Sequence, residues 1–188
     1  VYLYYGESPK NHDKLNNYLK LKSHSTHSYL EQLTEITKDY VHAQIEAGAG
    51  CIQIFDSWGG LLDEKYQELS LNYINQIAAS VQVDIPIILY TRDKLIDNII
   101  DLTPIKCFNL DTLDNIDNHI SKSITIQGNF NPQNFHADDD ELKKMAELVY
   151  MKYKNKENYI FNLGSGLTPD INPEKVGYFL SQLSSFRS

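Results

Sequence analysis

The chain has 188 residues, of which 41% are hydrophobic, and a formal net charge of −8. This length and composition suit one globular domain with a sizeable core, or part of a larger one. Only two arginines occur, Arg92 and Arg187, and the chain lacks the basic surface that binds nucleic-acid phosphates or an anionic membrane. No apolar stretch approaches the ~20 residues of a membrane span.

The N-terminal segment and the two cysteines indicate where in the cell the protein is expected. The chain opens VYLYYGESPKN, without a starting Met and without the basic and then apolar pattern of a signal peptide. We therefore expect a cytoplasmic protein whose N-terminal part lies outside this sequence. Cys51 and Cys107 both fall in apolar runs, and we expect both to be buried free thiols of a reducing compartment.

The first predicted elements are a helix, a strand and a second helix. Apolar residues recur at helical spacing within 27–47, which predicts an amphipathic helix. The strand CIQIF at 51–55 follows, and a glycine-bearing turn comes after it. Asp63 is expected to cap a helix that continues to about Val81. The predicted apolar face of the first helix consists of Leu30, Leu33, Ile36, Tyr40, Val41 and Ile45.

The rest of the chain continues to alternate strands with helices. A short helix is predicted over 94–100, and another short one precedes SITIQ. Asp138–Asp140 should open a helix that ends near Tyr153. Asn172 should cap the final helix, with Pro173 at its first position. Four further strands are predicted: IPIILY at 85–90, IKCFNL at 105–110, SITIQ at 123–127 and YIFNL at 159–163.

The five predicted strands are continuous apolar runs rather than alternating ones. Such strands are typical of a parallel sheet with helices on its faces, or of a closed barrel, and they predict the α/β class. Three of the strands end in glycine-bearing loops: DSWGG, GNFNP and GSGLTPD. Because parallel strands direct their C-terminal ends to one side, these loops are expected to converge on one ligand site.

These segments carry a resemblance to a known family. AGAGCIQIFDSWGGLL, ITIQGNFNP and FNLGSGLTPD resemble the signature segments of uroporphyrinogen decarboxylase, which read approximately AGAxxxQxFDSWxGxL, xxxQGNLDP and NLGHGxxPD in the same order. VYLYYGESPKN resembles the family's tyrosine-bearing segment, and PIILYTRD resembles PxIxFxKG. The resemblance covers essentially the whole chain.

The resemblance implies a (β/α)₈ TIM-type barrel, with residues 1–188 supplying its later strands and helices as one decarboxylase-like domain. It implies a cytoplasmic homodimer that uses no cofactor and no metal. The implied reaction converts the four acetate side chains of uroporphyrinogen III into methyl groups and gives coproporphyrinogen III of the haem pathway. The family's arginine-bearing loop and its key aspartate are then expected upstream of this sequence.

The resemblance also implies which residues form the site. Tyr2 matches the active-site tyrosine, which contacts a substrate carboxylate. Phe55 and Ser57 match the pair in which the ring lines the pocket and the hydroxyl binds a carboxylate. Ser165 stands where the family usually has histidine, and serine carries no charge near neutral pH. Arg92 replaces a family lysine, and a surface cation is the alternative interpretation of it.

Alternation along the first strand divides its side chains between two sides. Phe55 and Ser57 should share the side that lines the pocket, opposite to Ile52 and Ile54. Asp56 should point the other way and bond backbone N–H groups of the following turn. The glycines after it should let the loop fold back over the ring of Trp58.

Two other functions compete with decarboxylation. One is a non-catalytic half-barrel subunit used for assembly, which the loss of the family histidine favours. The other is a corrinoid-dependent methyltransferase of the same superfamily, whose zinc site uses His-x-Cys and a further Cys. No His-x-Cys occurs in this sequence, and the six histidines are expected to be solvated rather than ligands.

Overall fold

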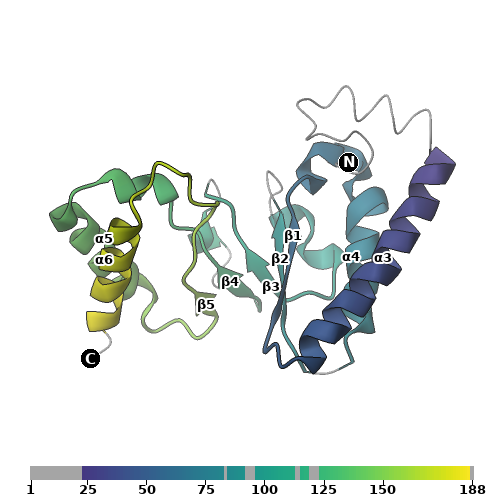
Figure 1. The fold of residues 1–188 in the computed structure, drawn as a ribbon, viewed down its shortest axis with the longest axis horizontal. Coiled ribbons are helices and arrows are strands. Elements are labelled where there is room, and N and C mark those ends of the chain that lie inside the picture. The colour runs from purple at the N-terminus through teal and green to yellow at the C-terminus, as the bar shows by residue number, and fades with distance from the viewer. Residues whose placement is uncertain (1–22, 83, 92–95, 113–114, 119–122, 187–188) are drawn as a thin grey trace. The chain divides into compact units, whose positions relative to one another are not determined.

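The computed structural model describes residues 23–82, 84–91, 96–112, 115–118 and 123–186. They divide into two compact units, residues 1–106 and residues 107–188 (Figure 1). Both units are built from parallel strands and helices, as the sequence predicts for the α/β class. The first unit contains α3 (Ser23–Glu46), β1 (Ile52–Asp56), α4 (Asn72–Ser80) and β2 (Ile87–Thr91).

In the first unit β1 and β2 pair in parallel, with Ile52 opposite Ile87 and Phe55 opposite Tyr90. The two helices lie side by side next to these strands (Figure 1). The core between helices and strands consists of Val41 of α3, Ile52 of β1 and Ile77 of α4. Each comes from a different element, so burial of these three side chains fixes the helices on one face of the strands.

The buried stripe of α3 differs from the predicted one. Val41 is buried as expected, but Ile36 and Tyr40 are 65% and 66% exposed. The threonines Thr26 and Thr34 are buried in their place. The Thr34 hydroxyl donates to the Leu30 carbonyl at 2.8 Å, so its polar atom is satisfied within the helix and can be buried.

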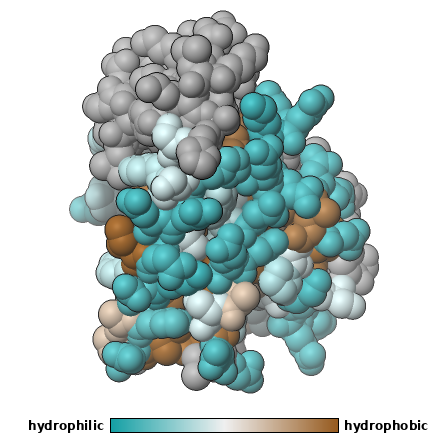
Figure 2. Space-filling model, turned by 90° about the vertical axis from the view of Figure 1, so that its right-hand side faces the viewer, coloured by the Kyte–Doolittle hydropathy of each residue, from teal (hydrophilic) through white to brown (hydrophobic). Residues whose placement is uncertain are grey.

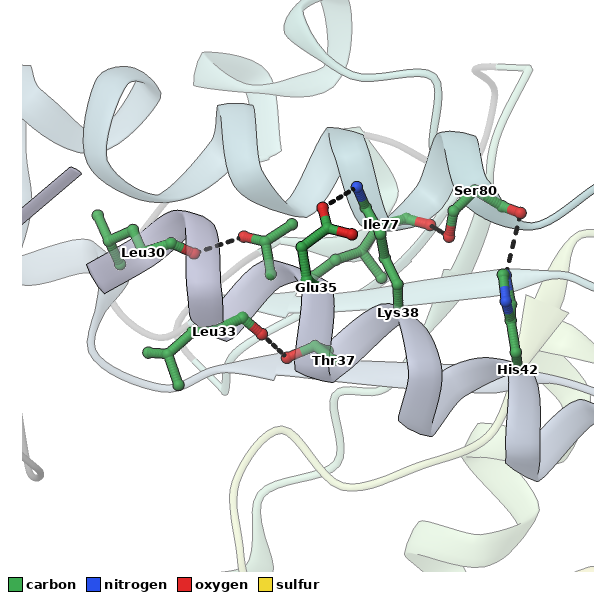
Figure 3. Close-up of polar contacts among 9 residues, drawn as sticks. Leu30, Leu33, Glu35, Thr37, Lys38, His42, Ile77 and Ser80 are labelled. Carbon is green, nitrogen blue, oxygen red and sulfur yellow. Dashed lines mark hydrogen bonds and ion pairs between the residues drawn. The ribbon is translucent and has the colours of Figure 1, made fainter. Parts of the chain in front are cut away.

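Polar contacts on α3 follow the same pattern (Figure 3). The Thr37 hydroxyl donates to the Leu33 carbonyl at 2.7 Å, and Lys38 donates to Glu35 at 2.7 Å. His42 Nε2 lies 3.1 Å from the carbonyl oxygen of Ser80, the last residue of α4. This contact ties the C-terminal half of α3 to the end of its neighbour.

The segment between β1 and α4 is less regular than predicted. Asp63 does not cap a helix: its φ is 44°, and it interrupts a 3₁₀ segment at Gly59–Lys65. A π-helical turn at Gln67–Leu71 then leads into α4. The apolar side chains of this segment are buried, with Tyr66 2% and Leu71 0% exposed, but the sequence did not predict the kink at Asp63.

The end of the first unit replaces the predicted helix at 94–100 with short 3₁₀ turns at Ile96–Asn98 and Ile100–Leu102. Asn75 of α4 holds the second turn, because its Nδ2 donates to the Leu102 carbonyl and its Oδ1 accepts from the Thr103 hydroxyl. Ile99 is 1% exposed and anchors the segment.

The second unit contains three parallel strands and two long helices that pack against each other (Figure 1). β4 pairs with both β3 and β5. Asp138 and Asn172 accept from backbone N–H groups of the first turns of the two helices, and Pro173 stands at the first helical position, as predicted. The elements are β3 (Cys107–Asn109), β4 (Thr125–Gln127), α5 (Asp139–Tyr153), β5 (Tyr159–Ile160) and α6 (Pro173–Ser185).

An aromatic core holds these helices to the strands. Phe179 of α6 is fully buried and its ring lies 4.6 Å from that of Phe130, which follows β4. Phe135 meets Phe179 edge to face at 5.6 Å, which is a favoured aromatic geometry. Leu142 and Ala146 of α5 are fully buried in the same cluster. The core therefore fixes the loop after β4 through Phe130.

The face of the molecule that carries α3 is mainly hydrophilic, with separate small hydrophobic areas (Figure 2). Ile36 and Tyr40 of α3 are exposed apolar side chains. Within the described part of the chain, no helix combines the length and the apolar character needed to cross a membrane. Of the two cysteines, Cys107 is buried as predicted, but Cys51 is exposed because it precedes β1 rather than lying within it.

Candidate functional site

The C-terminal end of β1 presents an aromatic side chain on the side away from the helices. Ile52 is buried against α3 and α4, whereas Phe55 is 65% exposed. The Phe55 ring lies 5.8 Å from that of Tyr90, its partner in register on β2. The prediction that Phe55 lies on the side opposite to Ile52 is confirmed, whereas a shared pocket side for Phe55 and Ser57 stays a prediction.

Asp56 anchors the turn that follows β1. Its carboxylate accepts a hydrogen bond from the Ser70 hydroxyl at 2.7 Å and another from the backbone N–H of Gly59. Burial raises the pKa of this carboxyl, and the hydrogen bonds oppose that rise in part. The prediction that Asp56 bonds backbone of the turn is confirmed. Its bond to Ser70, fourteen residues away, was not predicted.

Gly59 has no space for a side chain. A Cβ at this position would overlap the Asp56 carboxylate and come 2.5 Å from the ring of Tyr66. The Tyr66 hydroxyl lies beside the same carboxylate, and burial together with that negative charge raises the pKa of Tyr66. The glycine is therefore required by close packing around Asp56. Ser57, next to Asp56, is half-buried in this turn.

In the second unit the loops after β4 and β5 run side by side beyond the strands. The backbone N–H of Phe130 donates to the Asn162 carbonyl at 3.1 Å, and the Gly164 N–H donates to the Phe130 carbonyl at 3.0 Å. Phe130 and Leu163 form a parallel bridge. The GNFNP and GSGLTPD loops therefore lie side by side, as predicted, whereas their convergence on a ligand site stays a prediction.

A cluster of side-chain amides lies at the C-terminal ends of the three strands. Asn109 Oδ1 accepts from Gln127 Nε2 at 2.6 Å and from Asn162 Nδ2 at 2.9 Å. Asn109 and Gln127 are each 5% exposed. The sequence reasoning missed this cluster. The available signal was a carboxamide at the end of each of these runs, in CFN, TIQ and IFN.

Two glycines bring the loop after β3 against the other two loops. Gly128 has a φ of +113°, and a Cβ there would lie 3.0 Å from the Leu110 carbonyl oxygen. A Cβ on Gly164 would lie 2.5 Å from the Thr112 nitrogen. Asn129 Nδ2 also donates to the Asp111 carbonyl at 2.8 Å. The three loops therefore form one packed edge, and Ser165 follows Gly164 as an exposed residue.

The structure places the predicted site residues as follows. Phe55 and Ser57 lie together at the end of β1 in the first unit, and Ser165 lies on the loop after β5 in the second. Tyr2 and Arg92 lie outside the described residues. The common cavity of Phe55, Ser57 and Ser165 stays a prediction.

The described histidines make local polar contacts. His27 lies 2.7 Å from the Tyr73 hydroxyl and 3.1 Å from Glu68, and His136 lies 3.2 Å from Asp170. Among the described residues, no three His, Cys, Asp or Glu side chains gather as a metal-binding group.

Comparison with known proteins shows the family. The family model described as uroporphyrinogen decarboxylase matches residues 1–186. The chain is 30% identical over 195 residues to uroporphyrinogen decarboxylase of Hydrogenovibrio crunogenus, covering 98% of this chain and 55% of that protein. It is 31% identical over 197 residues to that of Francisella philomiragia, covering 99% and 57%. The chain thus spans a little over half the length of these curated relatives.

A solved structure supports the barrel fold. The putative vitamin-B12-independent methionine synthase from Listeria monocytogenes superposes with a TM-score of 0.59 at 15% identity, covering 90% of this chain and 57% of that one. At this identity the likeness concerns the fold alone, which is an α/β fold of the TIM-barrel type. The family match, the parallel strands and the glycine-bearing strand ends agree, and the chain belongs to the uroporphyrinogen decarboxylase family.

Proposed function

We propose that the complete gene product decarboxylates the four acetate side chains of uroporphyrinogen III, giving coproporphyrinogen III and four CO₂. The observation that carries this proposal is the position of the family's motif residues. Phe55, Ser57 and Ser165 stand at or just beyond C-terminal ends of parallel strands, where barrel enzymes bind their substrates. The proposal also includes a cytoplasmic homodimer, which rests on the family resemblance alone.

The chemical problem is the electron pair that remains when CO₂ leaves. Each acetate is attached to a pyrrole ring, and protonation of that ring turns it into an acceptor for the pair. The pair returns to the exocyclic carbon when that carbon takes up a proton and becomes a methyl group, and the ring then releases the proton it had gained, which restores the pyrrole. The substrate itself thus supplies the electron sink, and the protein has to orient the ring and stabilise charge.

The proposed site residues of this chain are suited to orienting the substrate and binding its carboxylates. The exposed Phe55 ring offers an apolar face to the macrocycle. The hydroxyls of Ser57 and Ser165 can donate hydrogen bonds to substrate carboxylates, and a bond to a charged group is worth roughly 1.5–3 kcal/mol. Tyr2 is proposed to contact a further carboxylate. Ser57 and Tyr2 are the proposed catalytic residues of this chain.

One observation favours a second candidate function. Ser165 replaces the family histidine, and a neutral hydroxyl binds a carboxylate more weakly than a protonated imidazole does. A non-catalytic subunit that retains the fold for assembly would tolerate this loss. The two functions differ in whether the complete gene product turns over uroporphyrinogen.

The test is a turnover assay of the complete gene product with uroporphyrinogen III, in which the products are oxidised and separated by number of carboxylates. We expect coproporphyrin to accumulate, and Ser57→Ala to lower kcat/KM about tenfold or more, the factor that ~1.4 kcal/mol represents. Ser80→Ala is the matched control, because its hydroxyl bonds the Ile77 carbonyl at the far end of α4. Absence of turnover in the parent protein would favour the non-catalytic subunit.

A further inference from the structure

We propose that Asn109 is a positioning residue for the loop after β5 and, through that loop, for the hydroxyl of Ser165. This inference rests on the proposed function, which gives Ser165 its role toward a substrate carboxylate. Asn109 itself stands at the last position of β3 and is 5% exposed. It therefore acts on the site from beneath the surface, without contact to the substrate.

Both the oxygen and the nitrogen of the Asn109 side-chain amide form hydrogen bonds. Its oxygen accepts two N–H groups, from Gln127 at 2.6 Å and from Asn162 at 2.9 Å. Its nitrogen donates to the Leu110 carbonyl at 3.1 Å. A carboxamide oxygen has two lone pairs, so these two donors occupy both of them. One buried side chain thus joins the ends of β3 and β4 to the segment after β5.

The link continues from Asn162 to the site. Asn162 Oδ1 accepts the backbone N–H of Leu163 at 2.8 Å, while its Nδ2 is held by Asn109. The Asn162 carbonyl accepts from Phe130, and Gly164 donates back to Phe130. Loss of the Asn109 oxygen would leave the Asn162 side chain with its bond to the Leu163 N–H but without its link to β3, which would loosen the start of the loop. Ser165 is the third residue after Asn162, so its position depends on this support.

A neutral amide suits this place. The proposed substrate carries eight carboxylates, and a buried carboxylate beneath the loop would repel them. An amide supplies both donor and acceptor with no net charge. The cluster of Asn109, Gln127 and Asn162 therefore fixes the loop without adding a net charge near the substrate. The electrostatic potential at the surface of the loop is then set by the residues that bind the substrate.

The test is a double-mutant cycle in the complete gene product with uroporphyrinogen III as substrate. Asn109→Leu keeps the approximate size and removes the amide. We expect it to lower kcat/KM about tenfold in the parent and less than about twofold in a Ser165→Ala background, because both changes disable the same hydroxyl. An equal loss in both backgrounds would overturn the proposal.

A matched control separates positioning from stability. Asn158 Nδ2 donates to the Ile124 carbonyl at 2.9 Å, and Asn158 precedes β5, at the opposite end from the site. Asn158→Leu also removes an amide-to-backbone bond, and it should leave kcat/KM within about twofold of the parent. If Asn109→Leu does not fold, Asn162→Leu, at a half-buried position, carries the same cycle.

Hydrogen exchange gives a readout that does not depend on activity. Asn109→Leu should speed exchange of the Gly164 amide, which bonds Phe130, whereas Asn158→Leu should not. Unchanged exchange at Gly164 would overturn the proposal even in an active enzyme. If exchange behaves as expected but the parent does not turn over uroporphyrinogen, the proposed function fails and the support of the loop by Asn109 stands.

Discussion

The two units hold their strand-end loops in different ways. In the first unit a carboxylate, Asp56, gathers the Ser70 hydroxyl and the Gly59 N–H around one buried charge. In the second unit neutral side-chain amides hold the loops, because the Asn109 oxygen accepts hydrogen bonds from Gln127 and Asn162. The first anchor changes with pH because burial raises the pKa of Asp56. The second contains no group that titrates.

A shared feature accompanies this difference. Each unit also has, in the loop that its anchor supports, a glycine with no room for a Cβ, Gly59 in the first unit and Gly164 in the second. At Gly59 the obstacle is side chains, the Asp56 carboxylate and the Tyr66 ring. At Gly164 it includes the Thr112 backbone. Side chains can rotate but backbone held in a packed edge cannot, so the second unit should be the less tolerant.

The largest expected effect is therefore that of Gly164→Ala. The added methyl group would lie 2.5 Å from the Thr112 nitrogen, and overpacking of this kind costs typically about 1–3 kcal/mol. We expect Gly164→Ala to lower the free energy of unfolding of the complete gene product by about 3 kcal/mol, and Gly59→Ala by about 2 kcal/mol. Denaturant unfolding measures both.

Gly166→Ala is the matched control for these changes, because no atom lies within 4 Å of the Cβ it would introduce. It should shift the free energy of unfolding by less than about 0.5 kcal/mol. If Gly59→Ala lowers the free energy of unfolding more than Gly164→Ala does, then the backbone beside Gly164 is not more rigid than the side chains beside Gly59.

A smaller effect is expected from Ser165→His, which restores the residue usual in the family. A charged hydrogen bond exceeds a neutral one by about 1.4 kcal/mol, so kcat/KM for uroporphyrinogen III should be unchanged or rise up to about tenfold. The gain should be largest at mildly acidic pH, since imidazole has a reference pKa of about 6.5. Loss of activity in this variant would contradict the placement of Ser165 beside a substrate carboxylate.

The smallest expected effect separates the two anchors by pH. Because the pKa of folded Asp56 is raised above 3.8, the folded chain binds more protons than the unfolded chain just above that pH. This group's contribution to stability is therefore present at low pH and lost as pH rises through the folded pKa. Asn does not titrate, so Asp56→Asn removes this pH-dependent loss of stability. The free energy of unfolding of the variant, relative to that of the parent, should therefore increase as pH rises from about 4 to about 7.

Urea unfolding at a series of pH values measures this gain. Asn109→Leu is the matched comparison, since it removes a neutral group and should differ from the parent by the same amount at every pH. A constant difference for Asp56→Asn as well would mean that Asp56 does not act as a charged anchor.

Local signals in the sequence were sufficient for the long helices and for the side on which β1 residues lie. Asp138 and Asn172 cap the helices they were expected to cap, because a cap needs only its own three or four residues. Phe55 and Asp56 point to opposite sides because alternation is a property of any strand.

What the sequence did not reveal depends on residues that are distant along the chain. The Asn109 oxygen meets partners 18 and 53 residues away, and no local pattern encodes that meeting. The positive φ of Asp63 interrupts a 3₁₀ segment, and the residues around Asp63 did not predict it. The apolar period of α3 assigned Ile36 and Tyr40 to the buried face, and it did not show that Thr34, whose hydroxyl bonds the Leu30 carbonyl, could be buried.

The most direct test of the account is a crystal structure of the complete gene product with bound coproporphyrinogen or its oxidised form. We predict that Phe55, Ser57 and Ser165 line one cavity, with both serine hydroxyls within hydrogen-bond distance of carboxylates of the ligand and Asn109 beneath the loop that carries Ser165. A structure in which the loop after β1 and the loop after β5 open on opposite sides of the barrel would contradict it.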